Sequence, residues 1–187
     1  MKRIILASMA FIIAVTAVAQ ERKYSIKSGV MKTVTNVLGQ KAEGTLFFDD
    51  YGNLECSQNK TVQNGIEKVE MSVISRDGKM HIVHHTLKQI QEIPLQESIN
   101  YLNLTPEIIK KYNIQELGRE MVLDKECIKY SAETSQAGET ASIIVWVWQG
   151  IPLKTITSSG GLSITVETID LQVDTIHDPK IFEIPSF

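Results

Sequence analysis

The sequence has few of the residues that mark a disulfide-stapled domain or a nucleic-acid-binding protein. Only two of its 187 residues are cysteines, too few for the disulfide framework that holds small secreted domains together. The 19 basic and 22 acidic residues leave a net charge of −3, without the clustered positive charge that nucleic-acid binding needs. Low-complexity tracts and solenoid-length repeats are absent as well. We therefore expect one domain whose core is held by apolar packing.

The two cysteines, Cys56 and Cys127, allow two interpretations. In an oxidising compartment they could form a disulfide. They could equally be two small buried hydrophobic residues, which is how free cysteines usually behave. Sequence leaves both interpretations open.

Catalytic and metal-binding patterns are also missing. No G-x-S-x-G occurs, and the H-x-x-H-H run at His81, His84 and His85 has the wrong geometry for one metal ion. On a strand His81 and His85 would lie about 13 Å apart on one face, while His84 would point to the other. We predict no catalytic residue, no metal and no cofactor, and we do not expect an enzyme.

The first nineteen residues have the layout of a secretory signal. Lys2 and Arg3 are followed by an almost wholly apolar run, and Ala17-Val18-Ala19 forms an A-x-A cleavage signature. The apolar run is shorter than the roughly 20 residues that span a bilayer. We expect residues 1–19 to be a signal peptide cleaved after Ala19. Residues 20–187 are then a single exported domain with no transmembrane anchor, most simply periplasmic.

Most of the remaining chain alternates apolar and polar residues, which is typical of strands with one solvated face. Turn residues such as Asn64-Gly65 and Asp77-Gly78 separate the alternating runs. The sequence predicts about nine or ten strands with short connections. The predicted ranges are 24–38, 41–49, 54–62, 69–76, 79–88, 115–122, 127–134, 140–149, 151–157 and 162–173.

The pattern changes to three- and four-residue spacing between Leu95 and Tyr112. This stretch predicts two short amphipathic helices. The second begins sharply, with Thr105 as N-cap, Pro106 in the first helical position and Glu107 near the positive end of the helix dipole. One helical insertion thus divides two blocks of strands.

Trp146 and Trp148 lie in the most apolar of the predicted strands. In an extended strand their rings share one face while Val145 and Val147 occupy the other, so this strand should be covered on both sides. The cover could be a second sheet around two core tryptophans, or else helices, a ligand or a partner.

Several fragments, taken in order, resemble the periplasmic lipoprotein-carrier (LolA/LolB-like) superfamily, and more closely its uncharacterised exported relatives. The fragments are Tyr24-x-x-x-Ser28-Gly29, Phe47-x-Asp49-Asp50-x-Gly52, Gly118 followed by Cys127, Trp146-x-Trp148-x-Gly150-Ile151-Pro152-Leu153, and Phe182-x-Ile184-Pro185. The resemblance covers essentially the whole mature chain. It implies a mainly β fold: a strongly curved antiparallel sheet, or unclosed half-barrel, with helices capping its concave face.

The same resemblance implies an apolar cavity on the concave face. It predicts a non-catalytic binding module for a lipid, an acyl chain of a lipoprotein, or another amphiphilic molecule. The candidate cavity residues are Phe47, Ile99, Leu102, Trp146 and Trp148. The alternative is an interaction or structural module that contacts another envelope protein and has no internal ligand site.

Overall fold

The structure is a computed structural model that describes residues 21–63, 66–95, 98–136 and 139–187. The predicted signal peptide, residues 1–19, and the predicted turn at Asn64 and Gly65 lie outside the described residues. Within these ranges no helix is long and apolar enough to cross a membrane.

Eleven strands form one antiparallel sheet in the order β6-β5-β4-β3-β2-β1-β11-β10-β9-β8-β7. The strands are β1 (Gly29–Val37), β2 (Gln40–Asp49), β3 (Leu54–Gln63), β4 (Ile66–Arg76), β5 (Lys79–His84), β6 (Gln89–Pro94), β7 (Gln115–Val122), β8 (Lys125–Gln136), β9 (Glu139–Trp148), β10 (Ile151–Ser159) and β11 (Leu162–Val173). Two short 3-10 turns, η1 (Asp50–Gly52) and η2 (Pro179–Phe182), complete the described elements with one α-helix. The predicted mainly β class is confirmed.

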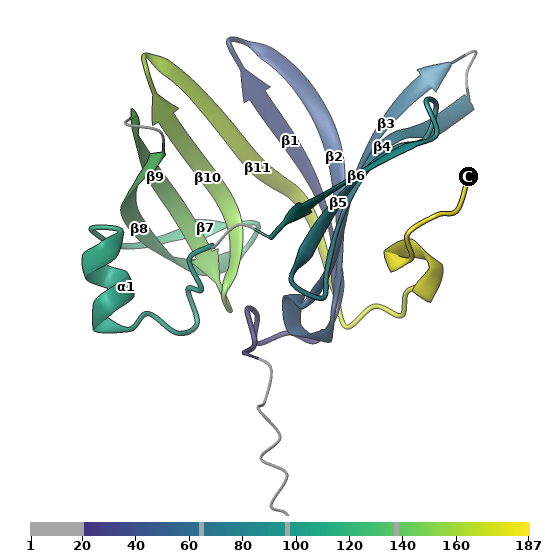
Figure 1. Ribbon diagram of the computed structural model, residues 1–187. Helices are drawn as coiled ribbons and strands as arrows, with labels where there is room; N and C mark the ends of the chain where they lie inside the picture. Colours follow the sequence, from purple (N-terminus) through teal and green to yellow (C-terminus); the bar gives the residue numbers. More distant parts are fainter. Residues whose placement is uncertain (1–20, 64–65, 96–97, 137–138) are drawn as a thin grey trace, which may run out of the picture.

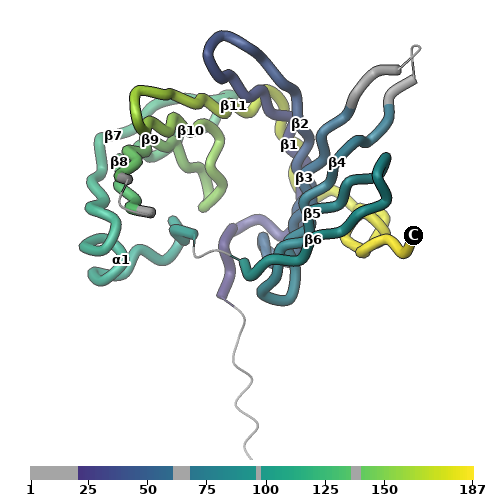
Figure 2. Tube along the Cα trace, turned by 45° about the horizontal axis from the view of Figure 1, so that its top comes forward, coloured from purple at the N-terminus to yellow at the C-terminus, as the bar shows by residue number. Residues whose placement is uncertain are grey.

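The sheet curls around a central space without closing. Figure 1 shows its two wings, β7 to β10 on one side and β2 to β6 on the other, and Figure 2 looks into the curl between them. Because β6 and β7 stand at the two ends of the strand order, they are the free edges of the sheet. The predicted unclosed antiparallel sheet is therefore found.

The prediction of two capping helices is wrong for the described residues. They contain only one α-helix, α1 (Pro106–Lys111), and none of its residues is buried. It begins as predicted, since the Thr105 side chain accepts a hydrogen bond from the Ile108 amide at 3.3 Å. Upstream, the Asn100 side chain accepts from the Leu102 amide at 3.1 Å, a local bond that favours a turn over a helix.

The strand predicted over 79–88 ends earlier, at His84, and the strand that follows it, β6, was not predicted. The range 79–88 divides into β5 and the first part of a reversal, because Lys88 takes a left-handed conformation with φ of 52° and the chain returns as β6. Positive φ at a non-glycine residue is uncommon and is tolerated mainly in turns. The sequence offers no Asn-Gly or Asp-Gly signal there, and so this hairpin was missed.

Side chains pack in three clusters that cover different parts of the sheet. One gathers Met31, Phe48, Trp146 and Leu153, and a second joins β8 and β9 to residues 99–114. A third is formed where Phe182 of η2 packs on Cys56, Ile74 and Val83. In Figure 2 this C-terminal segment lies outside the curl of the sheet, so the third cluster marks the convex side.

Candidate functional site

The strand registers assign each residue to one of two faces. Directly opposed residues in an antiparallel pair point to the same side. One such row crosses four strands through Thr35, Val166, Thr155 and Val145. We call its side the inner face and the opposite side the outer face. Cys56, which contacts the external C-terminal segment, belongs to the outer face through its partner Phe47.

A hollow of about 560 Å³ lies on the inner face, where β1, β2, β3, β10 and β11 curve around it. This volume falls within the roughly 300–1,000 Å³ of typical small-molecule sites. We call it the inner hollow. Its lining consists of Tyr24, Met31, Thr33, Thr35, Ala42, Glu43, Gly44, Leu46, Ser57, Asn59, Pro152, Thr155, Val166 and Thr168.

The lining of the inner hollow combines apolar surface with hydroxyl groups. Met31 and Leu46 are register partners and give it an apolar patch. Thr33 and Thr168 are also register partners, and Thr35 and Thr155 both flank Val166. Such a surface suits a molecule that is largely apolar but carries a hydrogen-bonding group.

The floor of the hollow is made by the segment that leads into β1. The Tyr24 hydroxyl donates to Glu55 at 2.5 Å, and Lys23 bonds the same carboxylate at 3.3 Å. Burial, with the neighbouring Glu55 charge as a further cause, raises the pKa of Tyr24 well above its usual value. The hydrogen bond to Glu55 holds the Tyr24 hydroxyl in place. The Tyr24 ring packs edge-on against the Phe48 ring, with the ring centroids 5.1 Å apart.

Residues 98–114 cover the inner face at β8 and β9. Ile99, Tyr101 and Ile108 pack against buried Tyr130 and Val145, and the rings of Tyr101 and Tyr130 stack with centroids 5.5 Å apart. A smaller pocket of about 190 Å³ lies between this segment and the floor residues Lys23 and Tyr24. The segment thus closes one end of the curl.

Trp146 is placed on the outer face, since its register partners are Lys129 and Lys154. Its ring lies within 4.6 Å of the Lys129 ammonium and 5.5 Å of that of Lys154, and its indole N–H donates to Glu120 at 2.7 Å. Hydrogen bonds from Lys129 and then Trp146 lower the pKa of Glu120. Trp148 shares this face and lies 5.1 Å from the Lys125 ammonium.

The other cavity candidates are also outside the inner hollow. Phe47 is on the outer face, where its ring meets that of His177 at 5.7 Å. Ile99 lines the smaller pocket next to the floor. Leu102 is 40% exposed and lies against Gly150. None of the five candidates is among the residues that line the inner hollow, but Trp146 and Trp148 pack in one cluster with the lining residues Met31 and Leu46.

The threonines that line the inner hollow were not among the predicted site residues. Thr33 and Thr35, and likewise Val166 and Thr168, recur at two-residue spacing and so face one side of their strands. Such spacing was visible in the sequence. Threonine is common on any solvated strand, however, so the spacing alone could not distinguish a ligand site from ordinary surface.

Both cysteines are buried free thiols. Cys56 belongs to the outer-face cluster around Phe182, and Cys127 to the cluster around Trp146. Burial raises the pKa of Cys56 to about 11. Of the two interpretations that the sequence left open, the structure shows two small buried hydrophobic residues.

The histidine run does not gather into one site. His81 is buried, with Nδ1 3.8 Å from Glu92, whereas His85 lies in the following turn and bonds the Ser72 hydroxyl at 2.8 Å. Over the described part of the chain, no group of three or more His, Cys, Asp and Glu side chains could hold a metal ion.

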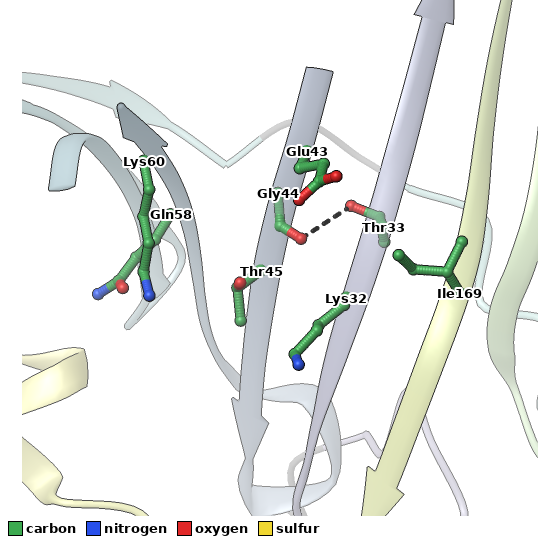
Figure 3. Close-up of a pocket in the computed structure, with 8 residues that line it drawn as sticks. All are labelled: Lys32, Thr33, Glu43, Gly44, Thr45, Gln58, Lys60 and Ile169. Atoms are coloured by element: carbon green, nitrogen blue, oxygen red, sulfur yellow. Dashed lines mark hydrogen bonds between the residues drawn. The ribbon is translucent and has the colours of Figure 1, made fainter. Parts of the chain in front are cut away.

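A second depression, of about 290 Å³, lies on the outer face and is drawn in Figure 3. Lys32, Thr45 and Gln58 form a register row across it. Lys32 pairs with Asp170 at 3.8 Å, and Thr33 donates to the Gly44 carbonyl at 3.4 Å. The lining of this depression is mostly polar and carries both charge signs, so it offers less apolar surface than the inner hollow.

The fold and the inner hollow together define an unclosed antiparallel half-barrel with a hollow concave side. The sequence matches no family model and no curated protein. Solved structures share the fold. An uncharacterised conserved protein from Thermus thermophilus aligns with a TM-score of 0.57 at 6% identity, over 86% of this chain and 87% of its own.

MucB of Pseudomonas aeruginosa, solved in a complex with MucA, aligns with a TM-score of 0.56 at 14% identity. The alignment covers 84% of this chain but only 56% of MucB. A LolA superfamily protein from Nitrosomonas europaea is less similar, with a TM-score of 0.42 at 9% identity over 86% of this chain and 92% of its own. At these identities the structural similarity concerns the fold alone.

Proposed function

We propose that this protein is an exported, non-catalytic module that binds one lipid, acyl chain or other amphiphile in the inner hollow. The observation that carries the proposal is the hollow itself, about 560 Å³ in volume with Met31, Leu46 and Val166 in its lining. Burial of apolar ligand surface there would supply the main driving force. The resemblance to lipoprotein carriers supports the same class of ligand, including the acyl chains of a lipoprotein.

The proposed location is the periplasm. Residues 1–19 carry the features of a signal peptide, and the mature chain released after Ala19 would act there without a membrane anchor. The similarity in fold to MucB, which the solved complex pairs with MucA, is consistent with an envelope location.

Native mass spectrometry of the purified mature protein, beside extraction and analysis of lipids, tests the proposal. A co-purifying acyl species is expected. A carboxylate placed in the hollow should abolish capture, because its desolvation by an apolar ligand is costly. Val166→Glu makes this change, and Thr165→Glu is the matched control, since the neighbouring residue points to the outer face.

We expect Val166→Glu to lose the bound species and Thr165→Glu to keep it, with both variants folded by circular dichroism. Absence of any ligand from the wild-type protein, even after incubation with periplasmic lipid extract, would contradict the proposal. Equal loss in both variants would show that the ligand does not occupy the inner hollow.

An envelope interaction module remains the second candidate. It is favoured by exposed apolar side chains on the edge strand β7, where Leu117 and Met121 are 48% and 65% exposed. Crosslinking in periplasmic extract, with Leu117→Lys and Met121→Lys as variants, would distinguish the two. A partner lost in both variants would support this candidate.

A further inference from the structure

The lining of the inner hollow contains little charge. Its single charged residue, Glu43, pairs in register with Val34 and so belongs to the outer face. Lys23, at the floor, is already bonded to Glu55. No lysine or arginine lines the hollow among the residues that the structure describes. A ligand anion would therefore find no cation there.

Hydroxyl groups in the hollow are free to bond a ligand. Within the described ranges, the hydroxyls of Thr35, Ser57, Thr155 and Thr168 hydrogen-bond no other residue. Thr168 is the most telling of them, because it is only 3% exposed and still lines the hollow. A ligand that covered such a hydroxyl without bonding it would leave a buried polar group unsatisfied, which is unfavourable. The lining therefore favours a ligand that brings a hydrogen-bonding group of its own.

The geometry points to a single-chain amphiphile with an uncharged polar group, such as a hydroxyl, ester or amide, as the ligand class of the inner hollow. This inference rests on the proposed function. The threonine hydroxyls can donate to and accept from such a group. A carboxylate or phosphate would instead lose water without gaining a cation, which makes its transfer far more costly than that of a neutral group.

Calorimetric titration of the mature protein with four probes of equal chain length tests the inference. The probes are monolauroylglycerol, lauramide, laurate and dodecyltrimethylammonium, each kept below its micelle concentration. We expect both neutral probes to bind at least about tenfold more tightly than laurate, which corresponds to about 1.4 kcal/mol. Equal or tighter binding of laurate would overturn the inference and leave the proposed function standing.

Single substitutions test whether the threonine hydroxyls cause the preference for neutral probes. Thr155→Val and Thr168→Val remove one hydroxyl each and should weaken monolauroylglycerol binding about two- to tenfold. Thr165→Val is the control, because its hydroxyl lies on the outer face, and it should bind as the wild type does. A control as weak as the other two would contradict the inference.

A gain of binding provides the complementary test. Thr155→Lys places a cation beside Val166 and should raise laurate affinity to at least that of monolauroylglycerol. Unchanged laurate binding in a folded Thr155→Lys protein would overturn the inference. If no probe binds the wild type at all, the proposed function fails instead.

Discussion

Tyr24 and Glu55 are joined by a 2.5 Å hydrogen bond although they lie 31 residues apart. The bond fixes the segment before β1 to the start of β3. Two further contacts hold the same segment, since the amides of Lys23 and Tyr24 both donate to the Tyr51 carbonyl at 3.0 Å. The floor of the hollow is thus tied to the hairpin that connects β2 to β3.

Because Tyr24 must stay protonated to donate its hydrogen bond, we expect the free energy of unfolding to fall at alkaline pH. Burial raises the pKa of Tyr24 above its ordinary value of 10.0, so the folded state favours the protonated phenol. This contribution to stability is complete below pH 10 and is lost as pH rises through the folded-state pKa. Above pH 10 we expect the urea midpoint of the wild type to fall more steeply than that of Tyr24→Phe. Parallel curves would contradict the prediction.

A methyl group at Gly150 should loosen the floor. Gly150 has φ of +83°, and a Cβ there would lie 2.4 Å from the Lys23 carbonyl oxygen. Gly78 has a similar φ of +72° but open space around it, so Gly78→Ala measures the backbone strain alone. We expect Gly150→Ala to lower the free energy of unfolding by about 1–3 kcal/mol more than Gly78→Ala. Chemical denaturation checks this, and equal costs would show that the floor can move without penalty.

Trp146 should matter for stability and not for ligand binding. It is 6% exposed and bonded to Glu120 on the outer face. Trp146→Phe removes ring volume and that bond, and we expect it to cost about 1–3 kcal/mol. Monolauroylglycerol affinity of the folded variant should equal that of the wild type. A large loss of affinity at full folding would place Trp146 in the binding site after all.

The two thiols should react only when the protein unfolds. Cys56 and Cys127 are both free and buried, and burial raises the pKa of each, which lowers the fraction of reactive thiolate. Ellman's reagent should label both in urea and neither in buffer. The thermal midpoint should be unaffected by dithiothreitol. A midpoint that falls on reduction would indicate a disulfide and contradict the prediction.

Local chemistry explains why much of the fold was predictable. Asp77-Gly78 and Gly160-Gly161 adopt the positive φ that their hairpins need, and residue alternation located the strands within a few positions. The same alternation placed Trp146 and Trp148 together on one face. It could not say which face is concave, because curvature arises from bulges such as that at Pro152 and from the pairing of all eleven strands. The pairing register, and not the alternation, places Trp146 on the face that carries Lys129 and Lys154.

The segment between Leu95 and Tyr112 shows a second limit. Ile99, Ile108 and Tyr112 of the predicted spacing do pack against the cluster on β8 and β9. Ile99 makes this contact from an irregular part of the chain. The Asn100 side chain accepts a hydrogen bond from the Leu102 amide, a local bond that competes with helix formation. Sequence periodicity therefore identified the packing residues of this segment better than its backbone conformation.

The inner hollow depends on the pairing of β1 with β11. β1 to β6 pair with their neighbours in the chain, as do β7 to β11, and among the described strands the two runs are hydrogen-bonded to each other along β1 and β11. Thr33 and Thr168 are register partners in this β1–β11 pair, which we call the seam. The seam joins residues that are far apart in the sequence. Each half contributes part of the lining, so a ligand can engage the complete hollow only when β1 and β11 are paired. Bound ligand should then hold the seam closed in proportion to its affinity, and two separately expressed halves should associate more readily in its presence.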